Sequence, residues 1–159
     1  MGAPPSDTPP GKPPEEPAGQ PAAIDWTLVR SPSIDTFETL ANAAFDALPE
    51  TFRRLCGEVV FRIEDFPDDD TLDAMGLQSE FDLLGLFRGR AVTVEPLTGQ
   101  EPNAIFLYRR PILDYWCERN EALGDVVTHV LVHEIGHHLG LSDEDMDGIE
   151  AAADRPRKP

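Results

Sequence analysis

The chain has 159 residues, the length of a single domain, and its 30 acidic residues outnumber its 13 basic ones, giving a formal net charge of −17. Such an acidic surface repels phosphate backbones and anionic membranes, so we expect no nucleic-acid partner and no membrane partner. No apolar run approaches the roughly 20 residues that span a bilayer, and the N-terminus lacks the basic start and apolar stretch of a signal peptide. We therefore expect a cytoplasmic protein. The oligomeric state stays open, with a monomer favoured.

Proline and apolar content divide the chain into three parts. Half of the 16 prolines lie in the first 21 residues, where almost nothing apolar is larger than alanine, and such a segment gains too little from burial to offset the entropy of ordering. We predict a disordered Pro-rich tail over residues 1–23, a folded domain over 24–153 and a short tail over 154–159. The two cysteines, Cys56 and Cys117, are too few for a disulfide framework and are expected to pack as small core thiols.

The first half of the domain shows one long helix, a strand and a short helix. Apolar residues recur at helical spacing over 34–48, with Ser33 as the expected cap and Pro49 as the end. Residues 58–64 have the β-branched and aromatic content of a strand. The three aspartates at 68–70 suit the start of a short helix better than a calcium site.

The second half adds another strand and three helices. Residues 83–89 carry two glycines among apolar residues and are expected to form a bent connection, whereas 103–108 form the second strand. We predict a helix from Pro111 through Cys117, the longest helix over 121–139, and a last short helix capped by Ser142. Strands early and helices late predict an α+β fold rather than alternating βαβ units.

The longest predicted helix contains the pattern H-E-x-x-H, formed by His133, Glu134 and His137. Four residues are just over one helical turn, so both imidazoles leave the same face and can bind one metal ion. Glu134 stands beside that face, where it can take a proton from a metal-bound water. Buried valines and leucines around the motif would hold the ligands rigidly, which favours a metal site over two ordinary core histidines.

A zinc site of this kind needs a third protein ligand. Residues 133–143 read H-E-x-x-H-x-x-G-x-x-D, which places Asp143 where the metzincin pattern has its third ligand, after a turn at Gly140. The other common zincin arrangement takes its third ligand from a glutamate on a separate helix, roughly 20 or more residues downstream. It is not expected here, because only Arg157, Lys158 and Pro159 stand at that distance. The alternative third ligands are Glu144, Asp145 and Asp147. The EF-hand-like opening at 143–148 lacks the rest of that motif, so calcium is not expected.

Two further histidines flank the motif. His129 lies one turn before His133 on the same helix face, so it either packs ordinarily or supports the site. For His138, a packing or hydrogen-bonding role near the site is as plausible as donating a hydrogen bond to the transition state. Tyr108, Tyr115 and His138 are all candidates for stabilising the oxyanion, and the sequence does not decide between them.

Three segments together resemble the small bacterial zincin-like metallopeptidase family: residues 83–89, residues 105–111, and residues 133–141 with the acidic residues that follow. The resemblance spans about residues 33–152. It implies a compact single-domain α+β zincin-like fold, a small mixed sheet packed on helices that include the H-E-x-x-H helix. It also implies that His133 and His137 are metal ligands and that Glu134 is the catalytic base. The family often reads G-L-D-E-D where this chain reads G-L-S-D-E, so Asp143 is a less direct match.

The pattern and the resemblance together predict a zinc-dependent metallopeptidase, a hydrolase that cleaves a peptide or protein substrate with Zn²⁺ as its cofactor. The predicted catalytic residue is Glu134, and the predicted metal ligands are His133, His137 and Asp143. The alternative is a metal-bound but non-hydrolytic peptide-binding module on the same fold, and a further alternative is an interaction protein working through its Pro-rich tail. The sequence leaves the substrate, the cleavage specificity and the metal identity open.

Overall fold

A computed structural model of the chain describes residues 2, 11, 19, 21–89 and 102–154. The chain divides into two units, residues 1–31 and residues 32–159. In the first unit, Asp25 closes a turn in which its carboxylate accepts hydrogen bonds from Thr27. Most of the predicted N-terminal tail, and all but Asp154 of the predicted C-terminal tail, lie outside the described residues.

The second unit begins with a pair of helices. Helix α1 (Ile34–Ala47) starts at Ser33, whose side chain accepts a hydrogen bond from the Thr36 amide, and buries Phe37, Ala41 and Ala44. This confirms the predicted helix and its cap. A second helix, α2 (Glu50–Cys56), follows directly after Pro49 and was not predicted.

A three-stranded mixed sheet has the order β1-β3-β2. Strand β1 (Val59–Glu64) pairs in parallel with β3 (Asn103–Tyr108), and β2 (Gly85–Arg88) pairs antiparallel with the other side of β3. Both predicted strands are confirmed. The bent connection predicted over 83–89 is wrong, because its central residues form the edge strand β2. The mixed sheet and its helices confirm the predicted α+β class.

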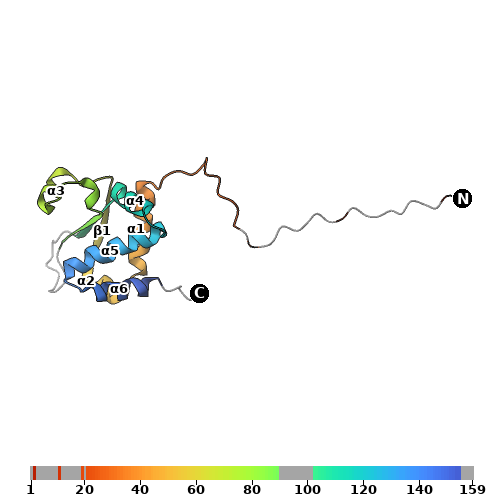
Figure 1. The fold of residues 1–159 in the computed structure, drawn as a ribbon. Helices are drawn as coiled ribbons and strands as arrows, with labels where there is room; N and C mark the ends of the chain where they lie inside the picture. Colours follow the sequence, from red (N-terminus) through yellow and green to blue (C-terminus); the bar gives the residue numbers. More distant parts are fainter. Residues whose placement is uncertain (1, 3–10, 12–18, 20, 90–101, 155–159) are drawn as a thin grey trace. The chain divides into compact units, whose positions relative to one another are not determined.

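The remaining helices cover the sheet and form the core. Helix α3 (Asp69–Met75) is capped by Asp68, whose pKa is lowered by the hydrogen bond with Thr71, as expected for a helix start. A short 3₁₀ turn (Glu80–Asp82) precedes β2, and α4 (Arg109–Cys117) follows β3. Figure 1 shows α5 (Leu123–Leu139) in the middle of this unit, where it contacts α1, α4, β2 and α6 (Asp143–Ala153). No described helix is both long and apolar enough to cross a membrane.

The cysteines differ from each other in environment. Cys56 is buried, and burial raises the pKa of its thiol to about 11, which fits the predicted core role. Cys117 is exposed at the end of α4, so the same prediction is wrong for it. Both are free thiols.

Candidate metal centre

Helix α5 ends in a turn that folds the chain back onto it. Gly140 has a left-handed φ of 72°, and its amide donates to the carbonyls of Gly136 and His137. The next amide, on Leu141, also donates to the Gly136 carbonyl at 2.9 Å. This pattern satisfies the last carbonyls of the helix, and the positive φ explains why glycine stands there.

Helix α6 begins at once and is fixed at both its start and its middle. Ser142 and Asp145 form a reciprocal capping box at its N-terminus. One turn later, fully buried Met146 lies against Gly136 of α5 so closely that a Cβ on Gly136 would lie 2.7 Å from Met146 Cγ. Close packing at this glycine therefore sets the position of α6 along α5, and with it the position of Glu150, one turn after Met146.

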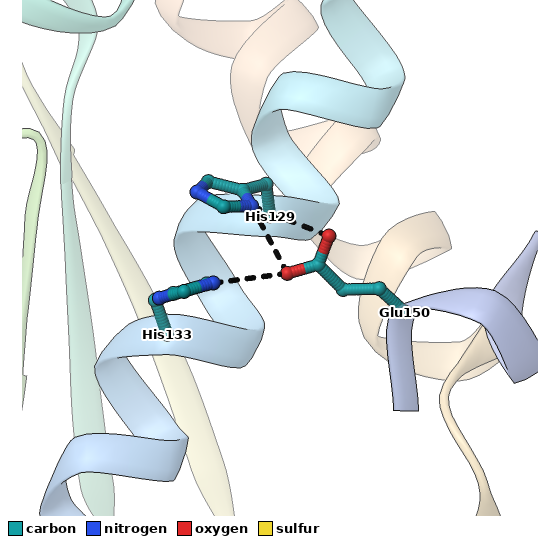
Figure 2. Close-up of side chains that lie close together, drawn as sticks. All are labelled: His129, His133 and Glu150. Carbon is teal, nitrogen blue, oxygen red and sulfur yellow. Dashed lines mark hydrogen bonds and ion pairs between the residues drawn. The ribbon is translucent and has the colours of Figure 1, made fainter. Parts of the chain in front are cut away.

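His129, His133 and Glu150 form a cluster between these two helices, shown in Figure 2. Glu150 Oε1 lies 3.0 Å from His129 Nδ1 and 3.1 Å from His133 Nε2, while His129 Nδ1 donates to Glu150 Oε2 at 3.2 Å. The two imidazole rings are tilted against each other with centroids 4.0 Å apart. One ligand atom from each residue lies within 4.8 Å of the other two, and within the described ranges no other group of three such residues meets this spacing.

Two atoms of this cluster are buried without a hydrogen bond. His133 Nε2 and Glu150 Oε1 are close, but neither has a hydrogen-bond partner among the described residues, so their contact lacks the direction of a hydrogen bond. A buried carboxylate oxygen in this state is unfavourable unless a cation offsets its charge. Two donors on one tetrahedral zinc ion, each about 2.0–2.2 Å from it, lie about 3.4 Å apart, close to the observed separation. The donor set and spacing therefore fit a metal ion such as zinc.

The protonation of His133 also suits metal binding. Burial lowers the pKa of His133, electrostatic repulsion by the neighbouring His129 lowers it further, and Glu150 raises it. The lowered pKa keeps the imidazole neutral near pH 7, and the neutral ring is the form that binds metals.

The structure does not bring the predicted ligands His133, His137 and Asp143 into one such group. His137 is exposed, and its ring is perpendicular to that of His133 with centroids 5.7 Å apart. Asp143 is the exposed first residue of α6, although its charge still acts on the pKa of His133. The alternative ligands are also exposed, and Asp145 is used in the capping box: Glu144, Asp145 and Asp147. The predicted ligand set therefore stays a prediction.

Glu134, the predicted base, lies on the side of α5 that faces β2. An added Cβ on Gly85 would lie 3.3 Å from Glu134 Cγ, which places the strand against the glutamate stem. Burial raises the pKa of Glu134 from 4.5 to about 7. The physical cause is the loss of hydration on burial, which disfavours the charged form of the carboxyl group.

This buried carboxyl should make the metal-free protein lose stability as pH rises. Between pH 4.5 and 7 the unfolded chain ionises Glu134 while the folded chain keeps it neutral, so the unfolded state is favoured progressively. Well above pH 7 the penalty is complete, about 3 kcal/mol. Urea unfolding of chelator-treated protein should show Glu134→Gln equal to wild type near pH 4.5 and more stable at pH 8. A constant difference across this range would contradict the burial of an ionisable group here.

Gly85 permits the close approach of β2 to α5. A Cβ at this position would lie 2.9 Å from the carbonyl oxygen of Phe106 and 2.9 Å from Val130 Cγ1. Because the carbonyl belongs to the neighbouring strand, relief requires a backbone shift. We expect Gly85→Ala to lower the free energy of unfolding by about 1–3 kcal/mol. The control is Gly124→Ala on α5, where an added Cβ meets nothing within 4 Å and should not destabilise.

Sequence reasoning left the role of His129 open and overlooked Glu150. His138 packs on Phe87 with ring centroids 4.2 Å apart, one of the roles considered for it. Glu150 carries a usable signal, since it lies one turn after Met146, whose inward position the apolar pattern shows. The sequence analysis considered the acidic residues of the first turn of this helix, up to Asp147, and glutamates 20 or more residues downstream, but not the residues between them.

A pocket of about 410 Å³ adjoins the cluster. His129 and Glu150 form part of its wall, and the other lining residues come from α5, α6 and the segments beside them: Ala47, Glu121, Asp125, Thr128, Ala151, Ala153 and Asp154. The cluster is therefore accessible from solvent on the side of His129 and Glu150, which gives an ion a route to it.

Comparison with known proteins identifies the family. A search of curated proteins finds no match to this chain. The family model for zincin-like metallopeptidases matches residues 56–153, a range that includes the sheet, α5 with its H-E-x-x-H pattern, and α6. This match covers more than half of the chain and confirms the resemblance that the sequence motifs suggest. The chain belongs to the zincin-like metallopeptidase family.

Proposed function

We propose that this protein is a zinc-dependent peptidase that hydrolyses peptide bonds with Glu134 as the general base. Membership of the metallopeptidase family supports a hydrolase acting on peptides. The observation that carries the proposal is the position of two buried atoms without a hydrogen bond, His133 Nε2 and Glu150 Oε1, near the buried carboxyl group of Glu134, the residue after His133. This combination provides a place for a metal ion and a base beside it.

The proposed roles follow from the H-E-x-x-H pattern and from the acidic residue that comes after Gly140 in the sequence. His133 and His137 hold the ion from one face of α5, together with a carboxylate from the region of α6 that the sequence assigns to Asp143. Zinc, when bound, supplies Lewis-acid polarisation of the scissile carbonyl and increases the acidity of a water molecule. Glu134 accepts a proton from the attacking water at a carboxylate oxygen and then delivers it to the leaving amine.

The surroundings of Glu134 and His133 support their proposed roles as base and metal ligand. Contact with Gly85 and the partial burial of Glu134 keep its carboxylate away from bulk water and restrict its motion. His133 is three-quarters buried and neutral, so it is available as a ligand. A protein that only bound peptides would not require a buried base at this position.

The first test is elemental analysis of protein purified without chelator or histidine tag, beside a His137→Ala control. The proposal expects about one zinc per chain in wild type, loss of zinc in the control, and cleavage in a peptide library by wild type alone. Zinc binding without cleavage across the library would favour the non-hydrolytic peptide-binding alternative. Absence of zinc from wild type after zinc is added back would reject the metallopeptidase proposal.

A further inference from the structure

The pocket of about 410 Å³ beside the cluster has a strongly acidic lining. None of its described lining residues is lysine or arginine, and four of them carry carboxylates: Glu121, Asp125, Glu150 and Asp154. A concave surface lined by one sign of charge focuses the electrostatic potential, so the negative potential is concentrated inside the pocket. The pocket therefore suits a positively charged ligand.

Two of these carboxylates come from the beginning of α5. Asp125 lies in the first turn of the helix, and Glu121 stands four residues before it. Trp116 Nε1 donates a hydrogen bond to the carbonyl of Glu121 at 2.8 Å, which fixes the backbone at this side of the pocket. Within the part of the chain that the structure describes, neither carboxylate has an ion-pair or hydrogen-bond partner, so both are available to a ligand.

The other two carboxylates lie one turn apart at the end of α6. The amide of Asp154 donates to the carbonyl of Glu150 at 3.0 Å, so the two residues share one helix face, where like charges repel each other. Asp154 also stands at the negative end of the helix dipole. Helix α6 has no basic residue to offset this charge. The arrangement is unfavourable in the free protein, and a cation in the pocket would relieve it.

The rest of the pocket wall favours an organic cation over a bare metal ion. Apart from His129, the other lining residues have small side chains: Ala47, Thr128, Ala151 and Ala153. These leave a volume within the range of small-molecule sites, and their methyl groups offer apolar contact. Lysine and arginine carry their charge on an apolar methylene stem, which can pack on such a wall while the charged group meets the carboxylates. A metal ion would make no use of the apolar wall.

The pocket lies next to the proposed metal site. His129 forms part of the pocket wall, and its ring packs against that of His133 with centroids 4.0 Å apart, as Figure 2 shows. Successive residues of an extended peptide advance by about 3.3 Å. A peptide whose scissile bond lies at an ion on His133 can therefore place a neighbouring side chain in the pocket.

We propose that this pocket binds a lysine or arginine side chain of the substrate, close to the scissile bond. This inference rests on the proposed peptidase function and names the substrate class of that site. Asp125 and Asp154, together with Glu121 and Glu150, attract the cationic group, and the alanines contact its stem.

The first test measures binding without any reaction. N-acetyl-arginine methylamide and its citrulline counterpart have nearly the same shape, but only the arginine derivative is charged, and neither has a free amino group. Both are titrated into the full-length protein while NMR follows the amides of Thr128, Ala151 and Ala153. We expect saturable shifts with the arginine derivative and binding of the citrulline derivative at least about tenfold weaker. Equal binding of the two, or no saturable binding of the arginine derivative, would overturn the proposal. Saturable shifts with calcium chloride alone would also overturn it and assign the pocket to a metal ion.

A matched pair of variants separates the pocket from the net charge of the protein. The double variant Asp125→Asn with Asp154→Asn removes two charges from the pocket and should weaken binding of the arginine derivative about tenfold. The control, Asp73→Asn with Asp114→Asn, removes two charges at exposed positions outside the pocket and should change binding less than about twofold. Circular dichroism verifies folding. Equal losses in both double variants would mean that only the net charge matters and would overturn the proposal.

Cleavage assays distinguish failure of this inference from failure of the proposed function. Library peptides with lysine should be cleaved with about tenfold higher kcat/KM than matched peptides with norleucine, and the pocket variant should lose this preference. Cleavage without preference for a basic residue at any position would reject the pocket inference alone. Binding of the arginine derivative without cleavage of any peptide would support the pocket as a site for basic peptides and reject the hydrolytic function.

Discussion

Replacing Glu134 with glutamine should lower the rate of peptide hydrolysis by about 10²- to 10⁴-fold, the usual contribution of a general base. Glutamine has nearly the same shape as glutamate but cannot accept the proton of the attacking water. The loss should appear in kcat, because proton transfer belongs to the chemical step rather than to substrate binding. Steady-state kinetics on the best peptide from the library provides the measurement.

Zinc content decides how this result is understood. Glu134 is beside the proposed ligands and is not one of them, so the variant should retain wild-type zinc content. The matched control is Glu38→Gln, which makes the same substitution at an exposed position of α1, outside the proposed site. Hydrolysis at the wild-type rate by zinc-loaded Glu134→Gln would reject the mechanism, whereas loss of zinc would make Glu134 a structural part of the site.

The sequence predicts the elements that carry their own local signals. Ser33 and Ser142 are caps with the side-chain oxygens that helix starts require, and both caps are confirmed. Gly140 is placed where only a residue tolerant of positive φ ends a helix well, and it has that φ. These features depend on a few neighbouring residues, so a linear pattern contains them.

Features that depend on contacts between distant segments were harder to predict from the sequence. Gly85 lets strand β2 lie close to Phe106 and Val130, but a glycine in the sequence does not show which distant residues it will contact. The cluster of His129, His133 and Glu150 depends likewise on how far α6 folds back along α5. A sequence motif gives only the spacing of residues along the chain, whereas the position of α6 depends on how this helix packs against α5.

Because of that packing, the stability of the protein should be sensitive to substitution of Met146. Met146 is fully buried between α6 and α5, and Met146→Ala should lower the free energy of unfolding by about 2–5 kcal/mol because it leaves a cavity. Met146→Leu conserves volume and should lose less than about 1.5 kcal/mol. Urea unfolding measures both, and an alanine variant as stable as wild type would show that α6 is not held by this contact.

A double-mutant cycle with Gly136 isolates the contact itself. Gly136→Ala alone should destabilise, since the new methyl group collides with the buried methionine side chain, although alanine favours a helix by about 1 kcal/mol elsewhere. In the Met146→Ala background the methyl group has room, so the same substitution should become neutral or stabilising, with a coupling energy of about 1–3 kcal/mol. Gly148→Ala, where an added Cβ meets nothing within 4 Å, should behave identically in both backgrounds. Equal effects of Gly136→Ala in the two backgrounds would mean that the helices are not joined at this point, and the fixed placement of Glu150 beside His133 would lose its physical basis.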